Sequence, residues 1–271
     1  MQKKPEVKSK LKKLKNNLKE MRSVLIAFSG GVDSTFLLKV AYDVLGENAV
    51  AVTAASSTYP QRELEQAKEF TKTMGIKHVI INSEENEIDD FSKNPINRCY
   101  YCKKELFSKI KQIASEKHTN YILDGSNIDD DADYRPGMKA LKELCIVSPL
   151  IDVCLNKKEI RELSREMGLN TWDKPAFACL ASRFPYGVEI TRSKLEQVEK
   201  AESFLYNLGI KQFRVRYHNE IARVEVLKDE FQTIFEHSNE IVKRFKELGF
   251  KYVTLDIEGY RKGSMNEVLK Q

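Results

Sequence analysis

Long apolar runs are missing from the sequence. No segment approaches the roughly 20 apolar residues that a helix needs to cross a bilayer, and the opening residues, Met-Gln-Lys-Lys-Pro-Glu-Val-Lys, contain no apolar core. We therefore expect neither a membrane-spanning segment nor a signal peptide, and we expect the protein in the cytoplasm. Hydrophobic residues make up 41% and charged residues 31% of the 271, as in a globular chain with room for one sizeable α/β domain and a smaller one.

A strong excess of one charge is also missing. The chain has 45 basic and 40 acidic residues, a formal net charge of +5. Enzymes that act on nucleic acids often carry a denser basic field. The mild excess favours an anionic small molecule such as ATP as the ligand, and it suggests RNA only weakly.

Cysteines are few and odd in number, five in all. Without an export signal, a framework of disulfides is not expected. Cys99 and Cys102 form a C-x-x-C pair at the start of a predicted helix, where the helix dipole and nearby basic residues favour thiolates. Such a pair indicates metal or redox chemistry. We predict that Cys145 and Cys154, on either side of a strand at 147–150, are small buried hydrophobes.

A third cysteine, Cys179, lies in the segment Ala-Cys-Leu-Ala-Ser-Arg. Together with Cys99 and Cys102 it could hold a [4Fe–4S] cluster, whose one free iron could bind a hydrosulfide or a substrate atom. Zinc or a redox pair is an alternative, although structural zinc normally takes a fourth ligand, the chain has only four histidines, and a redox pair does not need Cys179. Cysteines without a metal are the third alternative.

Apolar periodicity predicts alternating strands and helices over the first two thirds of the chain. This alternation is typical of a doubly wound parallel sheet, an α/β fold. The predicted strands are 24–28, 49–53, 78–82 and 121–124, and the predicted helices are 6–21, 33–45, 60–74, 101–117 and 156–168.

The pattern changes after Arg183-Phe-Pro-Tyr-Gly. A smaller α+β domain is predicted there, and we place the domains at 1–185 and 186–271, the second for substrate binding or oligomerisation. Its predicted elements are a helix at 191–208, strands at 212–217, 220–227 and 250–257, and a helix that ends near 248–249.

The most informative segment is Ser29-Gly30-Gly31-Val32-Asp33-Ser34, between a buried strand and a helix. Glycines let the backbone approach an anion, and the helix N-terminus offers free N–H groups. The two serines can donate hydroxyls, and Asp33 can cap the helix or orient a metal ion. The Lys-Ser/Thr of a Walker A loop is absent. A strand–turn–helix corner with no ligand is the alternative.

This loop resembles the signature Ser-Gly-Gly-x-Asp-Ser of the PP-loop ATP pyrophosphatases. The resemblance implies a sheet like that of the adenine nucleotide α-hydrolases. It also implies that the loop holds the β- and γ-phosphates of ATP while the α-phosphate is attacked. It also implies that Thr53 and Ser56 recognise adenosine. After a later strand, small and acidic residues suit ribose hydroxyls or Mg²⁺; these candidates are Asp124, Gly125, Asn127 and Arg135. Polar turns without a ligand are the alternative for both groups.

Further motifs resemble the LarE family of sulfur transferases over nearly the whole chain. They are Tyr100-Tyr101, Asp133-Tyr-Arg-Pro-Gly137, Ser182-Arg-Phe-Pro-Tyr-Gly187, Arg214-Val-Arg-Tyr-His218, Ile221-Ala-Arg223 and Tyr252-Val-Thr-Leu-Asp256. The resemblance implies ATP-dependent conversion of a carboxylate of pyridinium-3,5-biscarboxylate mononucleotide to a thiocarboxylate, for the nickel-pincer cofactor. It also implies a homo-oligomer, a hexamer, and partner proteins that insert nickel or use the cofactor.

The same resemblance supplies site residues in the second half of the chain. Arg214 and Arg216 alternate along one strand face, so both can bind the substrate phosphate; a solvated strand face is the alternative. Further candidates are Ser182, Arg183, Glu202 and Glu225, the glutamates being equally well explained as ordinary surface residues. Cys179 is the catalytic cysteine. Some members of the family give up its sulfur, whereas the additional Cys99 and Cys102 resemble the cluster-bearing branch.

Three other functions remain open from the sequence. A tRNA thiolation enzyme also combines a PP-loop with three cysteines, and the Lys-rich start of the chain favours it, although the motifs of the second domain do not. An amide ligase like NAD synthetase would use ammonia and need no cluster. A nucleotide-binding iron–sulfur carrier would release no pyrophosphate.

Overall fold

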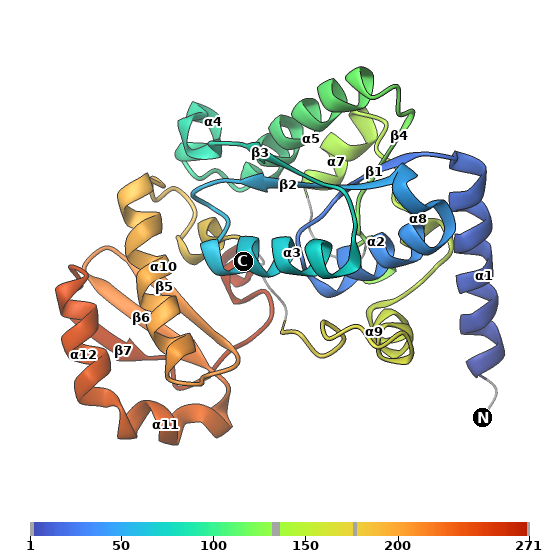
Figure 1. Ribbon diagram of the computed structural model, residues 1–271. Coiled ribbons are helices and arrows are strands. Elements are labelled where there is room, and N and C mark those ends of the chain that lie inside the picture. Colours follow the sequence, from blue (N-terminus) through green and yellow to red (C-terminus); the bar gives the residue numbers. More distant parts are fainter. Residues whose placement is uncertain (1–2, 132–135, 176–177, 270–271) are drawn as a thin grey trace. The chain divides into compact units, whose positions relative to one another are not determined.

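The computed structural model describes residues 3–131, 136–175 and 178–269. The chain divides into two compact units, the first made of 1–85 with 97–176 and the second of 86–96 with 177–271. The last boundary between the two units therefore lies at 176/177, whereas the sequence-based prediction places it at 185/186. Figure 1 shows the elements in chain order.

The first unit is built on a parallel sheet of four strands in the order β3-β2-β1-β4. This arrangement confirms the predicted α/β class. The strands are β1 (Val24–Ala27), β2 (Ala49–Ala55), β3 (His78–Asn82) and β4 (Tyr121–Leu123). Because β1 lies between β2 and β4, the loop that follows β1 is at the centre of the carboxyl edge, where sheets of this kind bind ligands.

Helices cover both faces of this sheet because successive residues of β1 point to opposite sides. The helices of the unit are α1 (Lys3–Met21), α2 (Val32–Leu45), α3 (Gln61–Met74), α5 (Arg98–Glu116), α6 (Ile128–Asp131), α7 (Gly137–Glu143), α8 (Pro149–Asp152) and α9 (Lys157–Glu166). Val24 and Ile26 belong to one apolar cluster with α1, α2 and α9, whereas Leu25 belongs to another with α5 and α7. None of the helices in the described ranges is long and apolar enough to span a membrane.

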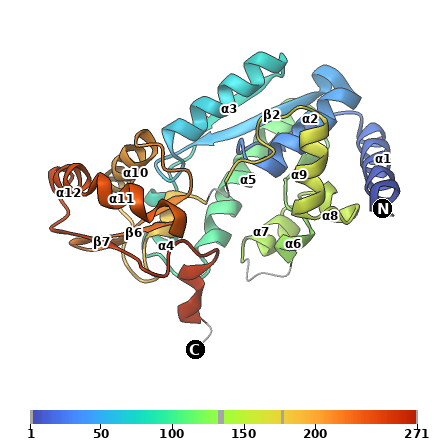
Figure 2. The same ribbon diagram turned by 90° about the horizontal axis from the view of Figure 1, so that it is seen from below.

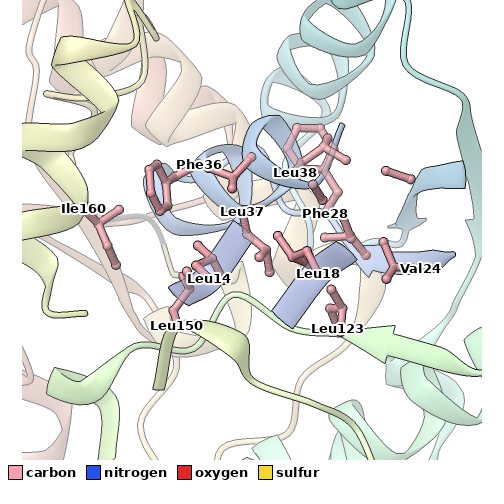
Figure 3. Packing of buried hydrophobic residues seen from close by; sticks show 14 of the residues in the cluster. Leu14, Leu18, Val24, Phe28, Phe36, Leu37, Leu38, Leu123, Leu150 and Ile160 are labelled. Carbon is pink, nitrogen blue, oxygen red and sulfur yellow. The ribbon is translucent and has the colours of Figure 1, made fainter. Parts of the chain in front are cut away.

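The larger cluster fixes α2, and with it the loop that begins α2. Leu14 and Leu18 of α1 have no exposed surface and point toward Leu37 of α2 in the packed interior (Figure 3). Helix α9 contacts the same helix α2 (Figure 2). Burying a leucine side chain contributes about 1.5–3 kcal/mol, so these contacts hold the start of α2 on a rigid support.

The second unit contains a three-stranded sheet in the order β5-β6-β7. Strands β5 and β6 are antiparallel, and β6 and β7 are parallel. Its strands are β5 (Phe213–His218), β6 (Ile221–Val226) and β7 (Tyr252–Leu255), and its helices are α4 (Asp89–Ser92), α10 (Arg192–Asn207), α11 (Phe231–Glu236) and α12 (Ser238–Glu247). The smaller C-terminal α+β fold is thus as the sequence predicts.

Segment 86–96 is joined to this second unit by hydrogen bonds. The buried side chain of Asn94 donates to the carbonyl oxygens of Phe184 (3.3 Å) and Pro185 (2.6 Å). In return, the backbone N–H of Gly187 donates to Asn94 O at 2.9 Å. The sequence contains no signal for this pairing, since the partners are about 90 residues apart.

The prediction for Cys145 and Cys154 is wrong. Both side chains are exposed, and both residues have a left-handed backbone, with φ of 57° and 55°. Each residue follows the end of a short helix, where its N–H and the next N–H bond back into the last turn in a Schellman motif. The predicted strand at 147–150 is also wrong: Val147 makes one isolated bridge to Leu123, and helix α8 then begins at Pro149.

Candidate active site

The loop between β1 and α2 presents an open helix N-terminus. Gly30 has a left-handed φ of 61°, a conformation that favours glycine. Gly31 is the N-cap of α2 and has no side chain that could occupy the N–H groups of the first turn. Asp33 lies inside that turn, so it is not the cap. Free N–H groups and the helix dipole suit an anion at this position.

The two serines of the loop bind each other. The hydroxyl oxygens of Ser29 and Ser34 are 3.0 Å apart, and the N–H of Ser29 donates to Ser34 Oγ at 3.2 Å. The hydroxyl of Tyr59 donates to the carbonyl of Ser29 at 2.8 Å. These bonds hold the loop in shape before any ligand arrives.

Asp33 receives donors from two distant parts of the chain. The Lys157 ammonium donates to Oδ2, and the Asn127 side-chain amide donates to Oδ1 at 3.3 Å. Burial raises the pKa of Asp33, and Lys157 acts in the opposite direction. The predicted neighbours Asp33 and Asn127 are therefore brought together. Lys157 was not predicted, because Lys157-Lys158 at a helix start looks like ordinary solvated surface.

Asp124, at the carboxyl end of β4, is also surrounded by donors. The hydroxyls of Ser126 and Ser148 each lie 2.5 Å from a carboxylate oxygen, and the Lys103 ammonium lies at 3.5 Å. The next residue, Gly125, lies against the start of α2, where an added Cβ would be 3.0 Å from the backbone nitrogen of Ser34. Asp124 and Gly125 thus border the loop. Arg135, the remaining candidate of this group, lies outside the described residues.

Thr53 is built into the interior and is only 3% exposed. Its hydroxyl donates to the carbonyl of Phe28 at 2.6 Å and lies 2.7 Å from His78 Nε2. Ser56 is half-buried, with its hydroxyl oxygen 2.9 Å from that of Thr58. Contact of these two residues with adenosine stays a prediction, and Thr53 has a second role in fixing the strand beside the loop.

The burial of His78 makes the stability of the protein depend on pH. Burial, with a smaller contribution from Lys68, lowers the pKa of His78 from 6.5 to about 4. The unfolded chain then binds the proton more readily than the folded one, so stability is lost as the pH falls from about 6.5 toward 4. After a discount for the partly exposed ring, we expect a loss of about 1–2 kcal/mol in free energy of unfolding. Urea unfolding at several pH values would measure it, and His78→Gln should flatten the curve in this range.

Cys99 and Cys102 lie one helical turn apart at the start of α5. Cys99 is exposed and Cys102 is half-buried, with its sulfur 3.9 Å from Oε1 of the buried Glu85. Burial raises the pKa of Glu85 against the hydrogen bonds that it accepts. Across the described ranges, no three His, Cys, Asp or Glu side chains gather as ligands of one metal ion. Cys179 belongs to the second unit.

Arg183 braces the segment that carries Cys179. Its guanidinium is 1% exposed and donates to the carbonyls of Ala178 (2.7 Å) and Cys179 (3.1 Å), and to the Ser182 hydroxyl (2.9 Å). Its other nitrogens make two 2.8 Å bonds to the two oxygens of Glu202. Burial opposes ionisation of Glu202, but Arg183, Arg214 and the N–H of Val215 offset it and lower the pKa. Glu202 is therefore a charged anchor.

Arg214 and Arg216 share a face of β5, and both are buried, so the alternative of a solvated strand face is wrong. Arg216 donates to the Glu225 carboxylate and to the Ser182 carbonyl, both at 2.8 Å. Arg214 lies over the ring of Tyr260, 5.1 Å from its centroid. Burial and then Arg183 lower the pKa of Arg214 to about 10, so it stays charged at neutral pH.

We call the group of Arg183, Glu202, Arg214, Arg216 and Glu225 the arginine cluster. Glu202 and Glu225 are 5% and 0% exposed, so the alternative of ordinary surface is wrong for both. Arg183 pairs with Glu202 and Arg216 pairs with Glu225, while the guanidinium of Arg214 donates to the carbonyl of Phe213 and lies over Tyr260. Guanidinium groups in such a setting suit phosphate. The cluster can therefore orient Cys179 and attract an anion.

Comparisons with known proteins match the sequence of both units. A family model described as the PP-loop domain matches residues 3–133. The pyridinium-3,5-bisthiocarboxylic acid mononucleotide synthase of Lactiplantibacillus plantarum is 38% identical over 93% of this chain and 92% of its own length. An uncharacterized protein of Synechocystis is 46% identical over 97% of this chain and 99% of its own length. One of Methanocaldococcus jannaschii is 34% identical over 93% of this chain and 97% of its own length. Because these relatives match both units, the chain belongs to the PP-loop family of ATP-using enzymes and, within it, to the LarE type.

Proposed function

We propose that the protein is an ATP-dependent sulfur transferase that acts on pyridinium-3,5-biscarboxylate mononucleotide. It adenylates a carboxylate of this substrate, releases pyrophosphate, and replaces the adenylate by sulfur to give a thiocarboxylate and AMP. The observation that carries the proposal is the open N-terminus of α2 behind Gly30 and Gly31, in a chain similar along most of its length to a synthase of the bisthiocarboxylic nucleotide.

The adenylation step follows from the chemistry of a carboxylate. Resonance and negative charge make it a poor electrophile, so an oxygen must first become part of a good leaving group. A carboxylate oxygen attacks the α-phosphorus of ATP, and the bond from that phosphorus to the bridging oxygen breaks. The N–H groups of the loop and the hydroxyls of Ser29 and Ser34 bind the departing pyrophosphate.

Asp33 and Asp124 are the residues that would hold Mg²⁺, which supplies charge neutralisation at the phosphates when bound. Their oxygens fit this use, because carboxylates are the ligands that Mg²⁺ prefers. Ligation through Asp33 would displace the Lys157 ammonium, which could then bind the pyrophosphate. Both acids are already held by protein donors, Asp33 by Lys157 and Asn127 and Asp124 by two serines, so their positions are fixed in advance.

The arginine cluster supplies the proposed contact with the substrate phosphate. Arg214 and Arg216 bring the charge, while Glu202 and Glu225 hold the guanidiniums in place. Ser182 contacts both Arg183 and Arg216, through its hydroxyl and its carbonyl, and so links the cluster to the Cys179 segment. These roles explain why long charged side chains are buried in a small domain.

For the sulfur, we propose a [4Fe–4S] cluster held by Cys99, Cys102 and Cys179. Thiols are the ligands that such a cluster takes, and two of them lie one turn apart at the start of α5, while Cys179 lies on a segment that Arg183 holds in place. When bound, such a cluster supplies an iron site for exogenous sulfide. Sulfur attacks the acyl carbon, and the bond from that carbon to the AMP oxygen breaks.

The proposal is tested with protein purified without oxygen. With the pyridinium nucleotide, MgATP and sulfide, we expect AMP and pyrophosphate in equal amounts, a thiocarboxylate product by mass spectrometry, and many turnovers by protein that contains iron. AMP formed only with tRNA would support the thiolation enzyme. Full activity with ammonia by iron-free protein would support the amide ligase, and no pyrophosphate with any carboxylate would support a carrier.

In the same experiment, the number of turnovers and the mass of the protein identify the source of the sulfur. If turnover stops after one event and the protein loses the mass of one sulfur at Cys179, the sulfur comes from that cysteine and the cluster is not the donor. By resemblance we also propose a homo-oligomer, a hexamer, with nickel-inserting and cofactor-using proteins as partners and no nucleic acid. Light scattering tests the first of these.

A further inference from the structure

Lys174 lies in the stretch of chain that follows α9, and its ammonium reaches the phosphate loop of the first unit. The side chain is 16% exposed. Its nitrogen donates to the carbonyl of Gly30 at 3.1 Å and to the side-chain oxygen of Gln66 at 2.8 Å. A carboxylate oxygen of Glu63 lies 2.6 Å away. The ammonium therefore connects the loop, helix α3 and its own segment.

The contact with Gly30 determines which way one peptide of the loop faces. In a planar trans peptide the C=O and the following N–H point in opposite directions. When the Gly30 carbonyl is held by Lys174, the N–H of Gly31 is turned away from Lys174. Helix α3 closes that side as well, since a Cβ on Gly30 would lie 3.4 Å from the Cβ of Ala67. The N–H is thus presented on the other side of the loop.

Glu63 keeps Lys174 in this place. Its carboxyl group, on the first turn of α3, is 4% exposed, and a buried carboxylate requires a compensating positive charge. Arg62 contributes at 3.5 Å and Lys174 at 2.6 Å. Because its charge is balanced by Glu63, the ammonium acts on the loop through the Gly30 carbonyl rather than as a phosphate ligand.

The backbone around Lys174 is fastened from the opposite side by α9. Arg161 donates to the carbonyl of Trp172 at 2.5 Å and to the carbonyl of Lys174 at 2.8 Å. The guanidinium of Arg165 lies 4.9 Å from the centre of the Trp172 ring. The stretch of chain whose lysine holds the Gly30 carbonyl therefore also contains an indole.

We infer that Lys174 is a positioning residue, which fixes the peptide after Gly30 for phosphate binding and couples the filling of the loop to residues 172–174. The inference rests on the proposed use of the loop for ATP, but not on the substrate or the sulfur source. It assigns a function to a segment that neither the loop motif nor the arginine cluster includes.

Trp172 is the only tryptophan of the chain, so its fluorescence reports on this segment alone. In the wild-type full chain, MgATP should change the fluorescence with the same midpoint as direct binding of radiolabelled ATP. In Lys174→Gln we expect binding at least about tenfold weaker, the effect of losing one charged hydrogen bond, and no fluorescence change at saturation. Lys174→Arg, which can still donate to the carbonyl, should recover part of both.

Lys12→Gln is the matched control, because Lys12 is an exposed lysine on α1; it should change neither signal. Lys174→Gln leaves Glu63 without its nearest cation, so Glu63→Gln/Lys174→Gln is made in parallel to keep the protein folded, and it should show the same two losses. Wild-type affinity and a full fluorescence response in the double variant would overturn the inference.

Hydrogen exchange separates this inference from the proposed function. Without nucleotide, the amides of residues 29–34 should exchange about tenfold faster in the double variant than in wild type, the equivalent of about 1.4 kcal/mol in local opening. If wild type does not bind ATP, the use of the loop is refuted while the exchange result still tests Lys174. Equal exchange in both proteins would overturn the positioning role.

Discussion

Replacing Asp33 with alanine is expected to slow pyrophosphate release from ATP by a factor of about 10² to 10³, as when one group that organises charge at a reacting centre is removed. The reason lies in the two donors that Asp33 holds, the Lys157 ammonium and the Asn127 amide. Without the carboxylate, neither is directed at the loop, and the proposed magnesium ion loses a ligand. Pyrophosphate release with saturating substrate measures the effect.

The slower pyrophosphate release in Asp33→Ala is expected without any loss of stability of the fold. Burial raises the pKa of Asp33, so the folded protein favours the protonated carboxyl more than the unfolded chain does. This preference stabilises the fold at low pH, and the stabilisation is lost as the pH rises from the unfolded pKa through the raised pKa of the folded state. Asp33→Ala should therefore melt no lower than wild type at neutral pH. Asp43→Ala is the control: Asp43 is on the same helix and pairs with Lys39. Undiminished turnover in Asp33→Ala would refute the assignment.

Replacing Arg183 with methionine is expected to lower the free energy of unfolding by about 3–5 kcal/mol, the cost of leaving one partner of a buried ion pair alone. Arg183 is 1% exposed, and the hydrogen bonds that it donates to Glu202, to the Ser182 hydroxyl and to the carbonyls of Ala178 and Cys179 would be lost. Glu202 would remain charged in the interior. Thermal unfolding should show a fall of roughly 10 °C.

Two further variants separate packing from function. Arg192→Met removes an exposed pair with Glu196 and should change stability by less than about 0.5 kcal/mol. Arg183→Met/Glu202→Leu removes both buried charges and should recover most of the stability. Thiocarboxylate formation should stay low in this double variant, because the guanidinium that donates to the carbonyls of Ala178 and Cys179 is gone. Restored activity together with restored stability would contradict the bracing role.

The phosphate loop was predictable because its chemistry is local. Strand, glycines and helix start follow one another in the chain, so their order alone predicts the geometry. Lys157 and Lys174 could not be predicted, because they reach Asp33 and Gly30 across 124 and 144 residues. A lysine at a helix start or in a connecting stretch carries no signal of the carboxylate or carbonyl that it will contact.

The arginine cluster was predictable in part. Alternation along β5 correctly placed Arg214 and Arg216 on one face, since that depends only on strand geometry. Their burial depends on Glu202 and Glu225, which lie on a different helix and strand. Conversely, Cys145 and Cys154 looked like core residues, but the left-handed ends of two short helices turn them toward solvent.

Because residues 86–96 belong to the second unit, this unit is assembled from two separate stretches of the chain. A fragment that starts at residue 177 would lack Asn94, so the carbonyls of Phe184 and Pro185 would lose their donor. During synthesis, residues 86–96 leave the ribosome before residues 177–271, so they can pack into the second unit only after that later stretch has been made. The second unit is therefore discontinuous in the sequence, and a continuous stretch that starts at residue 177 does not contain all of it.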